Sequence, residues 1–180
     1  PALDMLCRQG RMHPSVASFP NQAFYGGKLM PVGLSHQLEE ISSPVLFIPS
    51  RRDTGSLSGK TNFYEAQMVA DWAERIWKES PEVFDAHRTL GVITPYRSQI
   101  ALIRKQFQRK GIPALLDISV DTVERYQGSE RDVIIYSFCV NHRYQLKFLP
   151  NLTEENGVLI DRKLNVALTR ARKRLIVIGV

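Results

Sequence analysis

The sequence has few cysteines and lacks long apolar runs, and both absences exclude classes of protein. Cys7 and Cys139 are the two cysteines among 180 residues, and they lie far apart with no metal-ligand spacing. Neither a disulfide framework nor a zinc site is therefore expected, and small buried or half-buried side chains are the preferred interpretation. No apolar stretch is long enough to span a bilayer, and the N-terminus has no basic region followed by an apolar core. We therefore expect a cytoplasmic or nuclear protein with no membrane partner.

Length and charge are those of an ordinary globular domain. The chain is long enough to bury one core, and its apolar content of 43% with 23% charged residues is typical of soluble proteins. Lys and Arg number 24 against 18 Asp and Glu, which leaves a net charge of +6. This moderate excess suits a polyanionic partner but does not require one. Because the chain starts at Pro1 and stops after an apolar run, we expect residues 1–180 to be one domain of a larger protein.

From Pro44 onward, apolar runs of strand length alternate with stretches of helical periodicity. Several runs, such as VIIYSFCV and LIVIGV, are continuously apolar, as is typical of strands buried on both faces. The pattern predicts an α/β fold, a parallel sheet with helices on both sides. In such folds functional groups gather beyond the carboxyl ends of the strands, where Thr94 and Thr122 are expected. Strands are predicted at residues 44–50, 90–95, 115–123, 132–140 and 174–180, and helices at 62–80, 97–111 and 161–174.

Two of these helices carry terminal signals. Asn62 followed by Glu65 resembles a capping box at the start of the first helix. Gly111 closes the second helix, which places Ile100, Ile103 and Phe107 on one face.

The last predicted helix places an arginine at the edge of its packed face. On a helical wheel, Arg170 lies on the flank beside Lys163, where it could reach past the apolar stripe. A guanidinium suits a phosphate because it is permanently charged and donates two parallel hydrogen bonds. Composition alone favours the alternative, a surface arginine in a basic cluster. The stripe is Leu164, Ala167, Leu168 and Ala171, and the cluster adds Arg172, Lys173 and Arg174.

Four segments resemble motifs of superfamily 1 helicases. RKLNVALTRARKRLIVIG is similar to motif VI, and VDTVERYQGSERDVIIYS is similar to motif V. QGRMHP followed by FPNQAFYGGKL resembles the opening of the second motor domain, and GVITPYRSQ matches its threonine-proline-tyrosine turn. The motifs occur in the family's order and cover most of the chain. They resemble the branch that contains the nonsense-mediated-decay helicase and senataxin, which implies a RecA-like, P-loop NTPase-type fold.

The resemblance implies a role at a shared ATP site. In this family the first RecA-like domain holds ATP and Mg²⁺, and the second domain closes over it. Carried over by motif, Arg11 in QGRMHP and Arg170 in LTRAR are arginine-finger candidates that stabilise charge on the transferring phosphoryl group. The chain lacks the phosphate-binding loop, so the isolated domain is predicted to be inactive as an ATPase.

The motif V segment implies further contacts near the nucleotide. Glu130 in QGSERD aligns with the family's glutamate, and Gln127 and Gly128 shape the loop that carries it. The alternative for Glu130 is a solvated loop acid paired with Arg131.

Other motif residues are expected to face a single strand of DNA or RNA through phosphate and sugar contacts. These residues are Thr94, Tyr96, Gln99 and Thr122. Tyr96 could instead be an ordinary turn aromatic, and Gln99 could be a polar helix position.

The first motif departs from the family at one residue. Where a tyrosine commonly stacks on adenine, this sequence has Gly10, so adenine selectivity would have to come from Tyr25 or from outside the chain. His13, close to a helix start, is interpreted as a structural hydrogen-bonding group. Gly10 also favours an alternative function, a non-enzymatic nucleic-acid-binding module with a degenerate motor fold.

The segment GSLSGKT resembles a phosphate-binding loop but has the wrong spacing. Three residues separate Gly55 from Gly59, whereas the motif needs four. A complete enzyme built around Lys60 therefore stays a minor alternative. The choice between DNA and RNA is left open, because phosphate and sugar contacts are largely shared.

Overall fold

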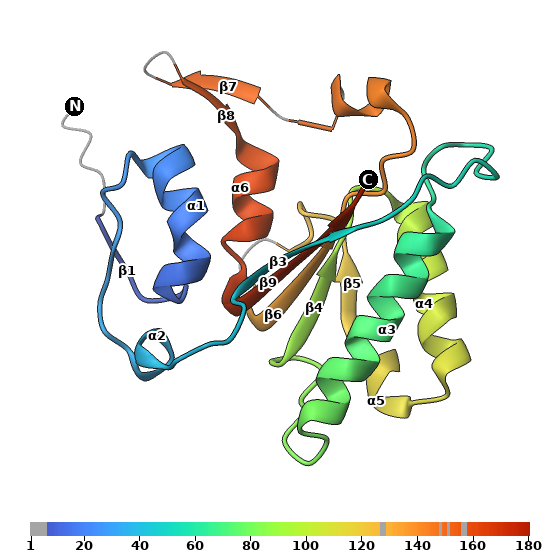
Figure 1. Cartoon of the computed structure of the whole chain (residues 1–180), viewed down its shortest axis with the longest axis horizontal. Helices are drawn as coiled ribbons and strands as arrows, with labels where there is room; N and C mark the ends of the chain where they lie inside the picture. Colours follow the sequence, from blue (N-terminus) through green and yellow to red (C-terminus); the bar gives the residue numbers. More distant parts are fainter. Residues whose placement is uncertain (1–6, 127–128, 148, 151, 156–157) are drawn as a thin grey trace.

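The computed structural model describes residues 7–126, 129–147, 149–150, 152–155 and 158–180. At its centre lies a five-stranded sheet of order β3-β9-β6-β4-β5, in which every pairing is parallel (Figure 1). The predicted α/β class is therefore confirmed. The strands are β3 (Val45–Pro49), β4 (Leu90–Ile93), β5 (Ser119–Asp121), β6 (Arg131–Ser137) and β9 (Ala171–Gly179).

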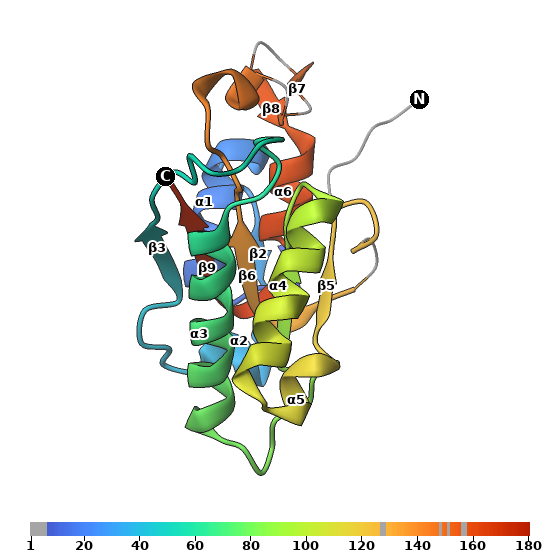
Figure 2. The same cartoon turned by 90° about the vertical axis from the view of Figure 1, so that its right-hand side faces the viewer.

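Helices cover both faces of the sheet (Figures 1 and 2). On one face lie α3 (Phe63–Glu79), α4 (Arg97–Lys110) and α5 (Pro113–Leu116). The other face packs against α1 (Pro14–Tyr25) and α6 (Arg162–Leu168), and the short helix α2 (Ser35–Leu38) contacts β9 near them. The central strand β6 serves both cores, which explains its continuous run of apolar residues.

The periodicity of the long helices matches their burial. In α3 the predicted apolar face is buried, with Ala66, Val69 and Ala73 fully removed from solvent. In α4 the buried apolar residues are Ile103 and Phe107, and Gly111 ends the helix in the left-handed conformation at φ 65°. Tertiary burial of these faces stabilises both helices.

The predicted capping box at the start of α3 is half right. The Asn62 side chain accepts a hydrogen bond from the Glu65 backbone N at 3.0 Å. The Glu65 carboxylate does not return to Asn62, because its Oε2 accepts from Ser137 Oγ at 2.6 Å and from the Cys139 backbone N at 2.9 Å. Glu65 therefore ties α3 to the end of β6.

The last predicted helix, 161–174, is too long. The structure ends α6 at Leu168 and starts β9 at Ala171, so Arg170 lies in the turn between them rather than on a helix flank. The backbone of residues 171–179 pairs with β6 and β3, and this pairing overrides the helical preference of the sequence. The strand predicted at 115–123 is also shorter than expected, since α5 takes its first residues.

Small elements that the sequence pattern did not predict flank the sheet. Strands β1 (Arg8–Gln9) and β2 (Met30–Pro31) pair in parallel beside α1. A 3₁₀ helix, η1, spans Arg143–Lys147, and an antiparallel hairpin joins β7 (Leu152–Glu155) to β8 (Val158–Asp161). None of the described helices combines the length and apolar character that crossing a bilayer requires.

Candidate functional site

Arg11, Glu130 and Arg170 come from three separate motif segments and lie at one end of the sheet. Glu130 immediately precedes β6, and Arg170 immediately precedes β9, its parallel neighbour. The Arg131 backbone N donates to the Arg170 carbonyl oxygen at 3.1 Å, and Arg11 Nη1 donates to the Thr169 carbonyl oxygen at 3.3 Å. The predicted nucleotide-facing residues thus meet at the amino ends of the central strands.

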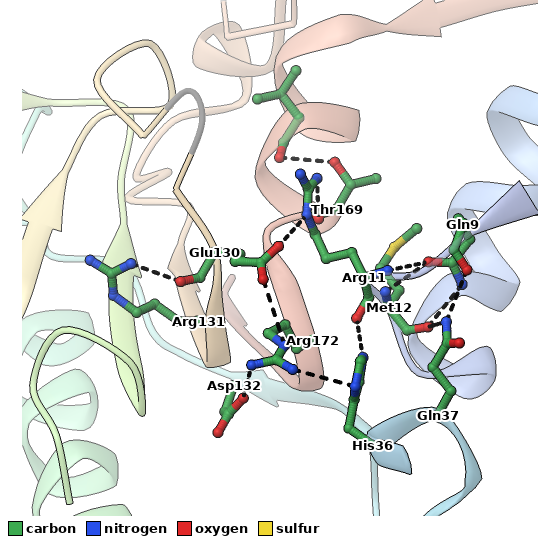
Figure 3. Close-up of polar contacts among 11 residues, drawn as sticks. Gln9, Arg11, Met12, His36, Gln37, Glu130, Arg131, Asp132, Thr169 and Arg172 are labelled. Atoms are coloured by element: carbon green, nitrogen blue, oxygen red, sulfur yellow. Dashed lines mark hydrogen bonds and ion pairs between the residues drawn. The ribbon is translucent and has the colours of Figure 1, made fainter. Parts of the chain in front are cut away.

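An ion pair joins two of these residues (Figure 3). Arg11 Nε lies 2.8 Å from Glu130 Oε2, and both side chains are partly exposed. Glu130 Oε1 lies 3.7 Å from Arg172 Nε, so the carboxylate lies between two guanidinium groups. The alternative partner from the sequence, Arg131, donates instead to the backbone oxygen of Glu130 at 2.7 Å. We refer to Arg11, Glu130 and Arg170 as the amino-end cluster.

Arg170 is the least satisfied member of the amino-end cluster. Its Nε is buried and has no hydrogen-bond partner among the described residues. Burial lowers the pKa of Arg170, the nearby charge of Arg11 lowers it further, and Glu130 opposes both. Because an arginine stays protonated at neutral pH, the side chain retains both its charge and an unused donor.

A ring of polar contacts positions the backbone of Arg11 (Figure 3). His36 Nε2 contacts the Arg11 carbonyl oxygen at 2.8 Å, and its Nδ1 lies 3.3 Å from Arg172 Nη2. Arg172 Nη1 also lies 3.3 Å from Asp132 Oδ1. The sequence interpretation had assigned Arg172 to a surface basic cluster and gave no role to His36, because no motif or periodicity links the two residues.

The residues around the first motif have structural roles. His13 caps α1, with Nδ1 accepting from the Ser15 backbone N at 3.2 Å and Nε2 contacting the Glu39 carbonyl oxygen at 3.0 Å, as its structural interpretation predicted. The hydroxyl of Tyr25 accepts from Asn165 Nδ2 at 3.4 Å, at the opposite end of α1 from Arg11.

Two apolar side chains lie against Gly10. A Cβ atom added to Gly10 would lie 3.3 Å from both Leu34 Cδ1 and Val32 Cγ2. A side chain here would press on Val32 and Leu34, which are both exposed. The space beside the first motif is thus filled from the segment that follows β2.

The expected strand-facing residues lie at the opposite, carboxyl end of the sheet. Thr94 follows β4 and Thr122 follows β5, and the Thr94 backbone N donates to the Asp121 carbonyl oxygen at 3.1 Å. The Thr94 side chain is fully buried, and its Oγ1 has no hydrogen-bond partner among the described residues. Thr122 and Tyr96 are half-buried, and Tyr96 lines a cleft of about 400 Å³.

Gln99 does not face this surface. Its side chain is fully buried, with Oε1 accepting from the Asn62 backbone N at 2.8 Å and Nε2 donating to the Asn62 carbonyl oxygen at 3.0 Å. Gln99 is therefore a buried polar residue of α4, which agrees with the second of the two interpretations drawn from the sequence. Gln99 Oε1 thus accepts from the Asn62 backbone N, which is the donor that the Glu65 side chain would satisfy in a complete capping box.

Two buried amides hold the loop of residues 53–61, which contains the GSLSGKT segment. Asn141 Nδ2 donates to the carbonyl oxygens of Thr61 at 2.7 Å and Gly59 at 3.3 Å, and its Oδ1 accepts from the Asp53 backbone N at 2.9 Å. Gln145 Nε2 donates to the Gly59 carbonyl oxygen at 2.9 Å. We refer to Asn141 and Gln145 as the amide clamp.

Helix α3 begins at Phe63 rather than directly after Gly59, so Lys60 is not at a helix N-terminus as a phosphate-binding loop requires. Gln127 and Gly128, the remaining predicted nucleotide-loop residues, lie outside the described residues. Among the residues that the structure describes, no three His, Cys, Asp or Glu side chains are grouped as metal ligands would be.

A protein-family model described as an AAA domain matches residues 2–180. The chain belongs to this AAA domain family. The chain is 32% identical over 187 residues to Helicase sen1 of Schizosaccharomyces pombe, and the alignment covers 97% of this chain and 10% of that protein. It is 33% identical over 189 residues to Regulator of nonsense transcripts 1 of Dictyostelium discoideum, with 98% of this chain and 13% of that protein covered. The chain therefore spans only a small part of these relatives.

A solved structure supports the fold of this AAA domain. The C-terminal domain of a possible DNA helicase from Lactobacillus plantarum WCFS1 aligns with a TM-score of 0.55 at 14% identity, covering 96% of this chain and 88% of that chain. The RecA-like fold is confirmed, and so is the resemblance to superfamily 1 helicases drawn from the four motifs. The chain is thus similar to one domain of these helicases.

Proposed function

We propose that this chain is the second RecA-like domain of an ATP-dependent DNA or RNA translocase, and that Arg11 and Arg170 are its arginine fingers. A first RecA-like domain of the same protein would hold ATP with Mg²⁺, whose hydrolysis supplies the free energy for movement along a single strand. The comparisons support this division of labour, because almost the whole chain matches only a small part of each helicase.

The observation that carries the proposal is the convergence of Arg11, Glu130 and Arg170. Arg11 lies 119 positions before Glu130 in the chain, yet an ion pair of 2.8 Å joins the two side chains. Arg11 Nη1 also donates to the carbonyl oxygen of Thr169, the residue directly before Arg170. Keeping two guanidinium groups together costs free energy unless an anion neutralises them. Glu130 supplies one negative charge, and a phosphate presented by a neighbouring domain supplies the rest.

Glu130 has a specific role in this proposal. Its carboxylate pairs with Arg11, whereas the Nε of Arg170 has no hydrogen-bond partner among the described residues. The exposed ion pair is weak enough to exchange for a phosphate. Arg11 can therefore turn from Glu130 to the phosphate when the two domains close, which links hydrolysis to closure.

The strand of DNA or RNA would run over the carboxyl end of the sheet. Tyr96 and Thr122 are half-buried there, beside the buried Thr94. We retain Tyr96 and Thr122 as contacts to phosphate or sugar, with Thr94 shaping the turn between them. Gln99 supports this surface from inside rather than touching the strand.

The test uses the domain joined to the first RecA-like domain of its own parent protein. Nucleic-acid-stimulated ATP hydrolysis should appear in the joined protein and be absent from the isolated chain. Arg170→Ala should lower the stimulated rate by about a thousandfold, the scale expected of an arginine finger. Arg104→Ala, which removes an exposed arginine of α4, is the matched control and should leave the rate unchanged.

Full activity of the Arg170→Ala protein would overturn the assignment of Arg170. Arg170→Lys gives a sharper comparison, because it keeps the charge but loses the planar pair of donors, and most of the activity should still be lost. If the joined protein binds oligonucleotides but hydrolyses no ATP, the rival function is favoured. That rival is a non-enzymatic binding module, and the observation that supports it is Gly10, which stands where the family commonly has a tyrosine.

A further inference from the structure

The cleft at the carboxyl end of the sheet is lined by aromatic rings. It has a volume of about 400 Å³ and opens where β4, β5 and β6 end. The aromatic side chains that line it are Tyr96, Tyr136, Phe138 and Tyr144. Aromatic rings stack favourably on unpaired bases, whereas the phosphate-sugar backbone is bound mainly by charged and polar groups.

Tyr144 offers the most accessible of these rings. It is 55% exposed, and its ring stacks on His142 with centroids 5.3 Å apart and planes inclined by 11°. Gly59 lies against the same pair, since a Cβ atom there would be 3.3 Å from His142 Cδ2 and 3.5 Å from the Tyr144 hydroxyl. The Tyr144 ring is therefore braced by its neighbours while much of it stays open to solvent.

Two lysines and two carboxylates line the cleft, and Lys60 is the lysine that can bind a phosphate. Lys60 lines the cleft, and no carboxylate among the described residues lies within ion-pair distance of its ammonium group. Both acidic lining residues have partners close to the start of α6. Glu124 pairs with Lys163 at 2.7 Å, a hydrogen bond that lowers its pKa, and Asp161 accepts from the backbone N atoms of Lys163 and Leu164 at the start of α6.

The amide clamp holds these parts in place before any ligand arrives. Gln145 Nε2 donates to the Tyr96 hydroxyl at 3.1 Å and to the Gly59 carbonyl oxygen at 2.9 Å, and its Oε1 accepts from the His142 backbone N at 2.9 Å. One buried side chain thus joins Tyr96, the Lys60 loop and the His142–Tyr144 stack. A preformed site avoids the entropic cost of ordering these groups on binding.

We propose that this cleft is a nucleotide pocket, which receives one unpaired base of the bound strand against Tyr144 while Lys60 binds a phosphate next to it. The inference rests on the proposed function in one respect, that a single strand passes over this end of the sheet. It adds that the strand is held by a base as well as by its backbone.

The test compares two single-stranded oligonucleotides in the joined two-domain protein by fluorescence anisotropy. One carries bases throughout, and the other carries abasic sugar-phosphate units. Wild-type protein should bind the first about tenfold more tightly, the scale of one base stacked on an aromatic ring. Tyr144→Ala should bind both oligonucleotides at the abasic level, and Tyr144→Phe, which keeps the ring, should retain the preference.

Lys60→Gln separates the phosphate contact from the base contact. It should weaken binding of both oligonucleotides by the same factor and reduce the salt dependence by about one phosphate contact. Equal affinity of the wild type for both oligonucleotides would overturn the pocket, as would a Tyr144→Ala protein that keeps the preference. If either occurs while Arg170-dependent ATP hydrolysis persists, the pocket fails and the motor proposal stands. If neither oligonucleotide binds and no ATP is hydrolysed, the motor proposal fails.

Discussion

The two ends of the central sheet are built from different chemistry. At the amino ends of β6 and β9, charged side chains meet near the surface and pair with one another, as Arg11 and Glu130 do at 2.8 Å. At the carboxyl ends, neutral amides are buried and every donor of Asn141 has a partner. Exposed ion pairs exchange partners at little cost, whereas buried amide networks do not. We therefore expect the amino end of the sheet to exchange its ion-pair partners readily and the carboxyl end to keep one arrangement.

This difference agrees with the two roles proposed for the domain. A residue that meets a nucleotide only when two domains close has to be released from its resting partner. A surface that binds a strand is more effective when it is already formed. Each end can be tested through its characteristic bonds.

The largest effect is expected at the amide clamp. Asn141→Leu removes the hydrogen bonds that its side chain makes with Gly59, Thr61, Asp53 and Asn62, and those with Gly59 and Asn62 are buried. The free energy of unfolding should fall by about 3 kcal/mol, as measured by urea denaturation. Gln108→Leu, on the exposed side of α4, should change it little. A loss in Asn141→Leu no larger than in this control would show that the carboxyl end is not held rigid by the amide clamp.

A similar effect, with a pH signature, is expected for Glu65. Burial raises the pKa of Glu65 from 4.5 to about 7, against the hydrogen bonds from Ser137 and Cys139 that lower it. Between these two values the folded protein keeps a proton that the unfolded chain has released, so stability falls as pH rises. The fall should be about 3 kcal/mol, since one pKa unit corresponds to about 1.4 kcal/mol.

Glu65→Gln should remove most of this slope and be more stable than wild type above neutral pH. Urea denaturation between about pH 5 and pH 8 measures it, because the shifted carboxyl titrates within that window. Glu82→Gln changes an exposed acid and serves as the control. An unchanged slope in Glu65→Gln would mean that the buried carboxyl does not titrate as its environment implies.

The smallest effect is expected in the amino-end cluster. Glu130→Gln removes the carboxylate that pairs with Arg11 and approaches Arg172, both partly exposed. The free energy of unfolding should change by less than about 1 kcal/mol, the usual range for exposed ion pairs. A loss of several times that size would contradict the comparison, because it would make the amino end as rigid as the carboxyl end.

Sequence patterns predicted the fold better than the site. Continuous apolar runs identified β6 and β9, and helical periodicity identified α3 and α4 with their buried faces. The prediction failed where residues could satisfy two patterns, as at 169–174, where strand pairing displaced the predicted helix. Local propensity is a weak determinant when a neighbouring strand offers backbone hydrogen bonds.

Sequence reasoning was also only partly successful for the site residues. Motif resemblance selected Arg11, Glu130 and Arg170, which the structure brings together, but it also selected Gln99, which is buried against Asn62. Polarity alone does not distinguish a buried amide from an exposed one. Asn141 and Gln145 were missed, since no motif marks them and their partners lie across the fold.

By itself, the sequence determined the order of the main strands and helices from Pro44 onward, the apolar faces that bury them, and the motif residues that resemble those of helicases. These depend on spacing and residue type along short segments. Only the tertiary structure decided that Arg11 pairs with Glu130, that Glu65 leaves its cap for Ser137, and that the Lys60 loop is fixed beside Tyr144. Such contacts join distant segments, and their partners are chosen by the packing of the sheet rather than by local pattern.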